Sequence, residues 1–150
     1  MASALRARFL LPAALCLSVV VALLPTAASA AGMTLAIGST GHLVAGVEVD
    51  LPITVSCDRL PPPTFNGMSN FQIEEAVGKS IARGSGFVSA PVTCDGSTQA
   101  AVVQIIADPT GPPFRRGKAV VTSAFFSVCS SVTFVCDSAS AGPQVITIKR

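Results

Sequence analysis

The chain has 150 residues, half of them hydrophobic, and contains neither Trp nor Tyr, the side chains that stack on sugars, so a carbohydrate-binding module is not expected. Two of its ten basic residues lie in the first 30 positions, which leaves eight basic and eight acidic side chains in residues 31–150. Because this part is neutral and its longest basic run is Arg115-Arg116, we expect neither nucleic-acid binding nor attachment to an anionic membrane surface.

The first 30 residues have the three parts of a secretory signal peptide. Arg6 and Arg8 precede an uncharged, mostly apolar run over residues 9–24, and Ala28-Ser29-Ala30 provides the small residues of a cleavage site. The apolar run is shorter than the roughly 20 residues that a membrane-spanning helix needs. We therefore expect cleavage after Ala30, secretion without membrane attachment, and one domain over residues 31–150.

The clearest strand signal covers residues 47–57, where every second residue from Val47 to Cys57 is apolar. This period of two predicts a strand with one buried face. Pro52 lies within it, and because proline donates no backbone hydrogen bond we expect a bulge or a break nearby. Before this strand, residues 33–37 predict a short strand and residues 38–41 predict a turn.

A stiff, proline-rich loop is expected over residues 58–67, followed by a strand over residues 69–77. Glu75 falls in the apolar row of that strand. We therefore expect the strand end to fray into solvent or its register to shift at this point.

The next part of the chain predicts strands separated by glycine signals. Gly84-Ser85-Gly86 predicts a kink between strand segments, and residues 87–94 predict a strand that Pro91 places at a sheet edge. Residues 94–97 predict a hairpin turn of the Asp-Gly kind. Residues 98–107 have apolar side chains at both odd and even positions, which predicts a strand covered on both faces. Such a strand is a good partner for residues 47–57.

Residues 108–117 predict a second turn-rich connection, and residues 118–129 and 144–149 predict the last two strands. Short strands separated by turn signals about every ten residues, with no helical periodicity after the signal peptide, predict an all-β domain. The expected architecture is an immunoglobulin-like antiparallel β-sandwich of about seven strands.

Four cysteines remain after cleavage: Cys57, Cys94, Cys129 and Cys136. An even number of cysteines in an exported chain indicates disulfides rather than metal ligands or reactive thiols. Of the three pairings that four cysteines allow, we favour Cys57–Cys94 with Cys129–Cys136. In this pairing the second bridge closes a hairpin end and the first joins comparable strand ends. If the second bridge forms, the loop between its cysteines is expected to expose Phe134.

No catalytic arrangement of residues stands out in the sequence. His42 is the only histidine and falls after the predicted turn glycines. The carboxylates of Glu74 and Glu75 are neighbours on a predicted strand, so they point to opposite faces and cannot act as a pair. We therefore expect no enzyme activity, no cofactor and no metal site.

Two groups of side chains are candidates for binding. The first is an aromatic residue beside two arginines in a proline-rich loop, a combination typical of interaction hot spots. It consists of Phe114, Arg115 and Arg116. The alternative is that Phe114 tucks under its own loop. The second group would line an apolar ligand pocket near the short cysteine loop. It consists of Phe125, Phe126 and Phe134.

The sequence resembles a group of small secreted proteins of high-GC Gram-positive bacteria that have no assigned function. The segments that carry the resemblance are residues 55–57, 84–89, 92–96 and 111–119 and the Cys129/Cys136 pair. The resemblance implies an immunoglobulin-like sandwich with two disulfides, and it brings no catalytic residues with it. A looser similarity, in architecture and in the late cysteine pair, is to neocarzinostatin-type apoproteins, which carry a small ligand.

Together these features predict a secreted, non-enzymatic β-sandwich that acts as a protein-interaction module. We expect a monomer that binds an unidentified protein partner. The alternative is a small-ligand carrier with an apolar pocket of the neocarzinostatin type.

Overall fold

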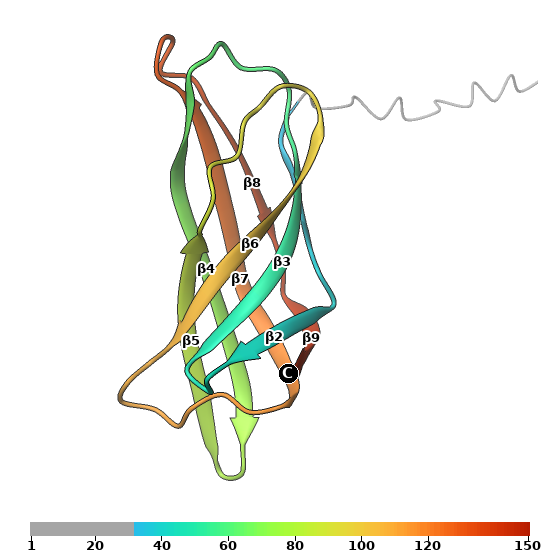
Figure 1. Ribbon diagram of the computed structural model, residues 1–150, viewed down its shortest axis with the longest axis vertical. Coiled ribbons are helices and arrows are strands. Elements are labelled where there is room, and N and C mark those ends of the chain that lie inside the picture. Colours follow the sequence, from blue (N-terminus) through green and yellow to red (C-terminus); the bar gives the residue numbers. More distant parts are fainter. Residues whose placement is uncertain (1–31) are drawn as a thin grey trace, which may run out of the picture.

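The computed structural model describes residues 32–150, which form nine strands and no helix (Figure 1). The all-β class is confirmed, whereas the predicted signal peptide lies outside the described residues. The strands are β1 (Thr34–Ile37), β2 (Thr40–Val44), β3 (Glu48–Ser56), β4 (Thr64–Val77), β5 (Ser80–Val88), β6 (Thr98–Ala107), β7 (Gly117–Ser130), β8 (Cys136–Ala141) and β9 (Gln144–Lys149).

Seven of these strands form a sheet that closes on itself. They follow the order β3-β2-β9-β7-β4-β5-β6, and β6 pairs again with β3. The pairs are antiparallel except for β2 with β9, which run parallel. An immunoglobulin-like sandwich has two separate sheets, whereas here β2 and β5 each pair on both sides, so the seven strands form one closed barrel.

Strands β1 and β8 lie outside this ring. β1 pairs with β3 beyond the end of β2, and β8 pairs with β7 beyond the end of β9. β1 packs beside β8, but no hydrogen-bonded ladder joins the two. Ladder hydrogen bonds therefore close the ring at the β2–β9 end, whereas β1 and β8 are in contact without a ladder, and the Gln144 side chain donates a hydrogen bond of 3.1 Å to the Ile37 carbonyl at the end of β1.

Pro52 does not interrupt its own strand. β3 pairs in continuous register with β6, as predicted, and Pro52 lies opposite Val102. On its other edge β3 exchanges partner at this point, from β2 to β1, and the Gly38 amide donates to the Pro52 carbonyl at 2.8 Å. A Cβ at Gly38 would lie 2.8 Å from the proline ring. The expected break therefore occurs in the neighbouring strand, where the missing proline N–H would have bonded.

The interior of the ring is filled by alternate residues along each strand, because successive side chains of a strand point to opposite faces. The alternation predicted for β3 is confirmed, since its four central apolar residues are all buried. They are Val49, Leu51, Ile53 and Val55. Val103 and Ile105 of β6 and Phe71 and Ile73 of β4 complete the centre of the same core.

The predicted strand over residues 87–94 is wrong. β5 runs without a break from Ser80 to Val88, and residues 89–97 form no strand. The kink expected at Gly84 is absent because this glycine has another role. A Cβ on Gly84 would lie 2.7 Å from Cζ of Phe114, so the aromatic ring occupies the place of the missing side chain.

Glu75 is 3% exposed, so the expected fraying of the strand end is wrong. Its carboxylate accepts a hydrogen bond of 2.8 Å from the backbone N–H of Arg115. A register shift does occur in β4 against β7, but between Gln72 and Ile73. The buried side chain thus fixes the loop before β7, because a polar group in the core must be hydrogen-bonded to be tolerated.

Both favoured disulfides are present, Cys57–Cys94 and Cys129–Cys136. The Cα atoms of the first pair are 5.2 Å apart and those of the second are 4.0 Å apart. The first bridge ties the end of β3 to residues 89–97 and lies in the core, whereas the second joins β7 and β8 at the end of their hairpin. Two disulfides are compatible with an extracellular protein.

Candidate functional site

The predicted interaction loop is only partly on the surface. Phe114 is 2% exposed and packs over Gly84, so its interpretation as an exposed hot spot is wrong. Arg115 and Arg116 are exposed beside it. The buried aromatic ring and the Glu75 hydrogen bond therefore anchor this loop, while the two arginines face solvent.

The three phenylalanines of the predicted pocket do not meet. Phe126 is fully buried in the core, Phe125 precedes it on the opposite face of β7, and Phe134 is in the loop between β7 and β8. A hollow of about 380 Å³ does lie beside Phe125, but neither of the other two lines it. The predicted apolar pocket is therefore not formed by these residues.

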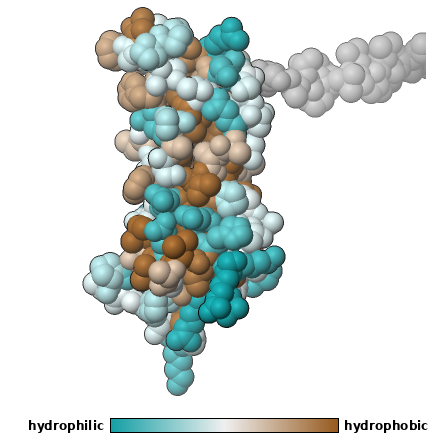
Figure 2. All heavy atoms as spheres, in the orientation of Figure 1, coloured by the Kyte–Doolittle hydropathy of each residue, from teal (hydrophilic) through white to brown (hydrophobic). Residues whose placement is uncertain are grey.

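Three exposed large apolar side chains, among them the most exposed one in residues 32–150, lie together at the end of the β7–β8 hairpin, which we call the hairpin tip (residues 131–135). Val132, Phe134 and Val135 are 61%, 82% and 54% exposed. The tip is at the top of the molecule in Figure 1, and brown and tan atoms cover part of it in Figure 2. Contiguous exposed apolar side chains of this kind mark interaction sites.

Ser130, which is fully buried, holds the hairpin tip in one shape. Its hydroxyl donates to the Pro61 carbonyl at 2.7 Å and accepts from the backbone N–H groups of Val132 and Thr133, each at 3.3 Å. The N–H of Phe134 donates to the Ser130 carbonyl at 3.0 Å. With the Cys129–Cys136 disulfide at its base, the tip is bonded both across itself and to the proline-rich loop.

Phe134 also has an unfavourable backbone conformation. Its φ is +56°, in the left-handed region that only Ala45 shares among the other described non-glycine residues. This conformation costs an ordinary L-residue about 1 kcal/mol or more. Local strain of this kind in a rigid, exposed turn is typical of binding and switching segments.

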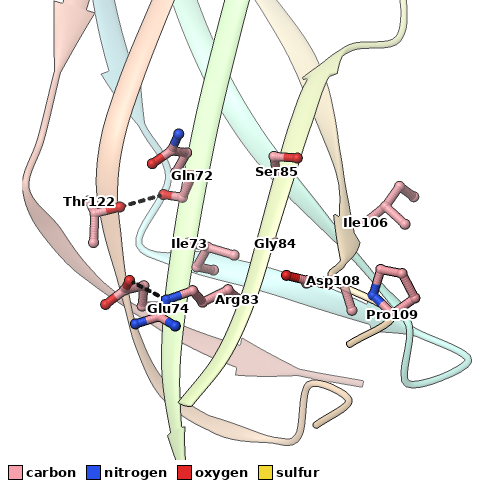
Figure 3. A pocket seen from close by; sticks show the side chains of 11 residues that line it. Gln72, Ile73, Glu74, Arg83, Gly84, Ser85, Ile106, Asp108, Pro109 and Thr122 are labelled. Atoms are coloured by element: carbon pink, nitrogen blue, oxygen red, sulfur yellow. Dashed lines mark hydrogen bonds and ion pairs between the residues drawn. The ribbon is translucent and has the colours of Figure 1, made fainter. Parts of the chain in front are cut away.

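A second feature is a groove of about 480 Å³ that crosses the outer surface of β4, β5 and the end of β6 (Figure 3). Glu74 and Arg83 form an ion pair of 2.9 Å across it. Asp108 accepts hydrogen bonds from the backbone N–H and the hydroxyl of Thr110, and these bonds hold the pKa of its carboxyl below the usual value. The Asp108 carboxyl is thus stabilised as an anion, which does not suit a general acid.

His42 lies in β2 rather than in a turn, because residues 40–44 continue as a strand after Ser39. It is exposed opposite Asp50 of β3. Partial burial raises the pKa of the neighbouring Glu48, with a hydrogen bond and the charge of Asp50 adding to the rise. Within residues 32–150, no three His, Cys, Asp or Glu side chains are placed to hold a metal ion.

The hairpin tip was missed as a site in the sequence, although a signal for it was present. Residues 132–135 are largely apolar and lie between two cysteines only seven positions apart. A loop closed this tightly has no room to turn its own apolar side chains inward. Such a loop therefore predicts exposed apolar side chains once the disulfide is assumed.

Comparisons of the chain with protein-family models, with curated proteins and with solved structures give no match. The part of the chain from residue 32 onward has no helix with the length and apolar character to cross a membrane.

Proposed function

We propose that the protein is a secreted, non-enzymatic protein-interaction module that binds its partner through the hairpin tip. The observation that carries the proposal is Phe134, which is 82% exposed and held at a positive φ. Both properties are unfavourable in the free protein, because the ring is in water and its backbone is strained. A partner that covers the ring removes the first of these costs.

The rigidity of the hairpin tip supports the same proposal. The disulfide and the Ser130 hydrogen bonds restrict the tip before any partner arrives. A pre-organised loop loses less conformational entropy on binding than a flexible one. An aromatic side chain at the end of such a turn is suited to fill a pocket as a hot spot.

The finer fold assignment is also a proposal. We infer an immunoglobulin-like sandwich whose edges have joined, with β1, β2, β3 and β6 in one layer and β4, β5, β7, β8 and β9 in the other. The pairing of β3 with β1 and β6, and of β4 with β5 and β7, supports this division. Secretion by the predicted signal peptide, and membership of the secreted Gram-positive group, belong to the same proposal.

Phe134→Asn is expected to increase the free energy of unfolding by about 1 kcal/mol and to abolish partner binding. Asparagine adopts the left-handed conformation more readily than phenylalanine, and the lost ring is mostly exposed. Urea denaturation measures the first effect. For the second, proteins retained from culture fluid and cell envelope are quantified, and the partner is then purified and titrated against both variants.

Ala45→Asn is the matched control, because Ala45 has a φ of +49° in the β2–β3 turn, away from the hairpin tip. It is expected to stabilise the protein by a similar amount and to leave partner binding unchanged. If Phe134→Asn retains the same partner with the same affinity as Ala45→Asn, the hairpin tip is not the binding surface.

A further inference from the structure

A hollow of about 540 Å³ lies at the end of the ring opposite the hairpin tip. It is bounded by the β2–β3 turn, the loop before β7 and the end of β9. Residues more than 100 positions apart meet here because β9 pairs with both β2 and β7 at this end. The lining residues are Leu43, Ala45, Gly46, Phe114, Arg115, Arg116 and Arg150.

The charge around this hollow is strongly one-sided. Three of the five arginines in residues 32–150 line it, and the one ion pair in that part of the chain is Arg83 with Glu74, elsewhere. Figure 2 shows a group of strongly hydrophilic atoms low on the right, where β9 ends in Figure 1. Even with a terminal carboxylate on Arg150, three guanidinium groups leave the hollow cationic.

None of the nearby carboxylates within residues 32–150 forms an ion pair with these arginines. Glu75 is buried beneath the loop, where it accepts the backbone N–H of Arg115 rather than its side chain. Glu48 pairs with Val44 across β2 and β3, so it lies on the opposite face of the sheet from Leu43, which lines the hollow. Asp50 lies on the same opposite face, beside His42.

The backbone that carries the arginines is fixed. Phe114 packs against Gly84 in the core, and the Glu75 hydrogen bond holds the next residue at 2.8 Å. Arg150 directly follows β9, which pairs with β7 through Gly117 and Ile148. Arg115 therefore projects from an anchored position, while Arg116 and Arg150 each lie one residue outside a strand, so little backbone ordering is needed for the three to bind together.

We propose that this hollow is a binding site for a phosphate group. The guanidinium fork matches the oxygens of a phosphate and binds it bidentately, and a phosphate carries more charge than a carboxylate to balance three arginines. The hollow is larger than one phosphate, so the rest of the ligand contacts Leu43 and the turn at Ala45 and Gly46. This site is independent of partner binding at the hairpin tip.

In the test, the exported protein is titrated with sodium pyrophosphate and, separately, with vesicles of phosphatidylglycerol. Binding is monitored by calorimetry and by the NMR signals of the arginine side chains. Binding of pyrophosphate at about 1 mM or tighter is expected, with shifts at Arg115, Arg116 and Arg150. Arg116→Gln and Arg150→Gln are each expected to weaken it roughly tenfold, because each removes charged hydrogen bonds. If the protein binds the vesicles and pyrophosphate displaces them, the phosphate group belongs to a lipid headgroup. If only pyrophosphate binds, the phosphate group belongs to a soluble ligand.

Arg83→Gln is the matched control, since Arg83 is an exposed arginine outside the hollow. It is expected to bind pyrophosphate as the wild type does, and all three variants are expected to unfold at the wild-type urea concentration. The proposal is overturned if neither probe binds, or if Arg83→Gln weakens binding as much as Arg116→Gln. The second result would show a general attraction to positive charge rather than a site.

Discussion

Phe114→Ala is expected to lower the free energy of unfolding by about 3–5 kcal/mol, the usual cost of removing a buried phenylalanine ring. The ring is 2% exposed and occupies the space that Gly84 leaves beside it. Its loss opens a cavity that backbone atoms line on one side, because Gly84 has no side chain to move into it. The effect is a large share of the about 5–15 kcal/mol that stabilises a small domain.

Urea denaturation measures this change, and Phe87→Ala is the control because Phe87 is 56% exposed on the outer face of the same strand as Gly84. The control is expected to lose less than about 1 kcal/mol. A Phe114→Ala variant as stable as the wild type would contradict the buried position of the ring and support the exposed position considered from the sequence. Gly84→Val is expected to destabilise as well, since its side chain would overlap the ring.

Replacing Cys57 and Cys94 together by alanine is expected to cost about 4 kcal/mol, and replacing Cys129 and Cys136 about 2.5 kcal/mol. The difference arises because the first bridge has a sequence separation of 37 and the second of only 7, so the first restricts the unfolded chain more. Cys57 and Cys94 also belong to the core, which adds a packing loss to the first pair.

Denaturation of the two double variants in parallel measures the order of these effects. The short bridge has a second readout, because it closes the base of the hairpin tip. Its removal is expected to weaken partner binding through a looser tip while leaving most of the stability intact. A larger loss of stability for Cys129 and Cys136 than for Cys57 and Cys94 would contradict the loop-length argument.

Local patterns in the sequence predicted the parts of the fold that depend on neighbouring residues. The alternation over residues 47–57 predicted β3, and the apolar run over residues 98–107 predicted both β6 and its pairing with β3. The last strand, residues 144–149, was predicted with its observed limits. In each of these segments the burial of one or both faces repeats along the strand itself, so the signal is contained within it.

The errors arose where a glycine or a proline is required by contact with a residue far away in the sequence. Gly84 was interpreted as a kink and Phe114 as an exposed ring, but each explains the other across thirty positions. Gly38 and Pro52 are related in the same way, since the ring of one lies where the Cβ of the other would be. Composition alone cannot separate a glycine that bends its own backbone from one that makes room for another segment.

For each of the two proposed sites, the sequence alone identified only some of the residues or properties. Arg115 and Arg116 were identified as a candidate surface, but Arg150 joins them only because β9 pairs with β2 and β7. Phe134 was expected to be exposed in the loop that the Cys129–Cys136 bridge closes, and it is, but the apolar pocket to which it was also assigned is not formed. Neither a closed sheet nor a left-handed φ can be inferred from local composition.

The seam between β1 and β8 also bears on how the folded protein moves. Elsewhere around the ring, separating two strands breaks a ladder of backbone hydrogen bonds, but no such ladder joins β1 to β8. Local opening begins where the fewest such bonds must break, so transient breathing of the native state starts along this seam. The backbone N–H groups on the edge of β8 that faces β1 are then expected to exchange their hydrogens with solvent before those of β3 and β6. An extended peptide that adds a strand to the sheet is expected to pair with this same edge of β8.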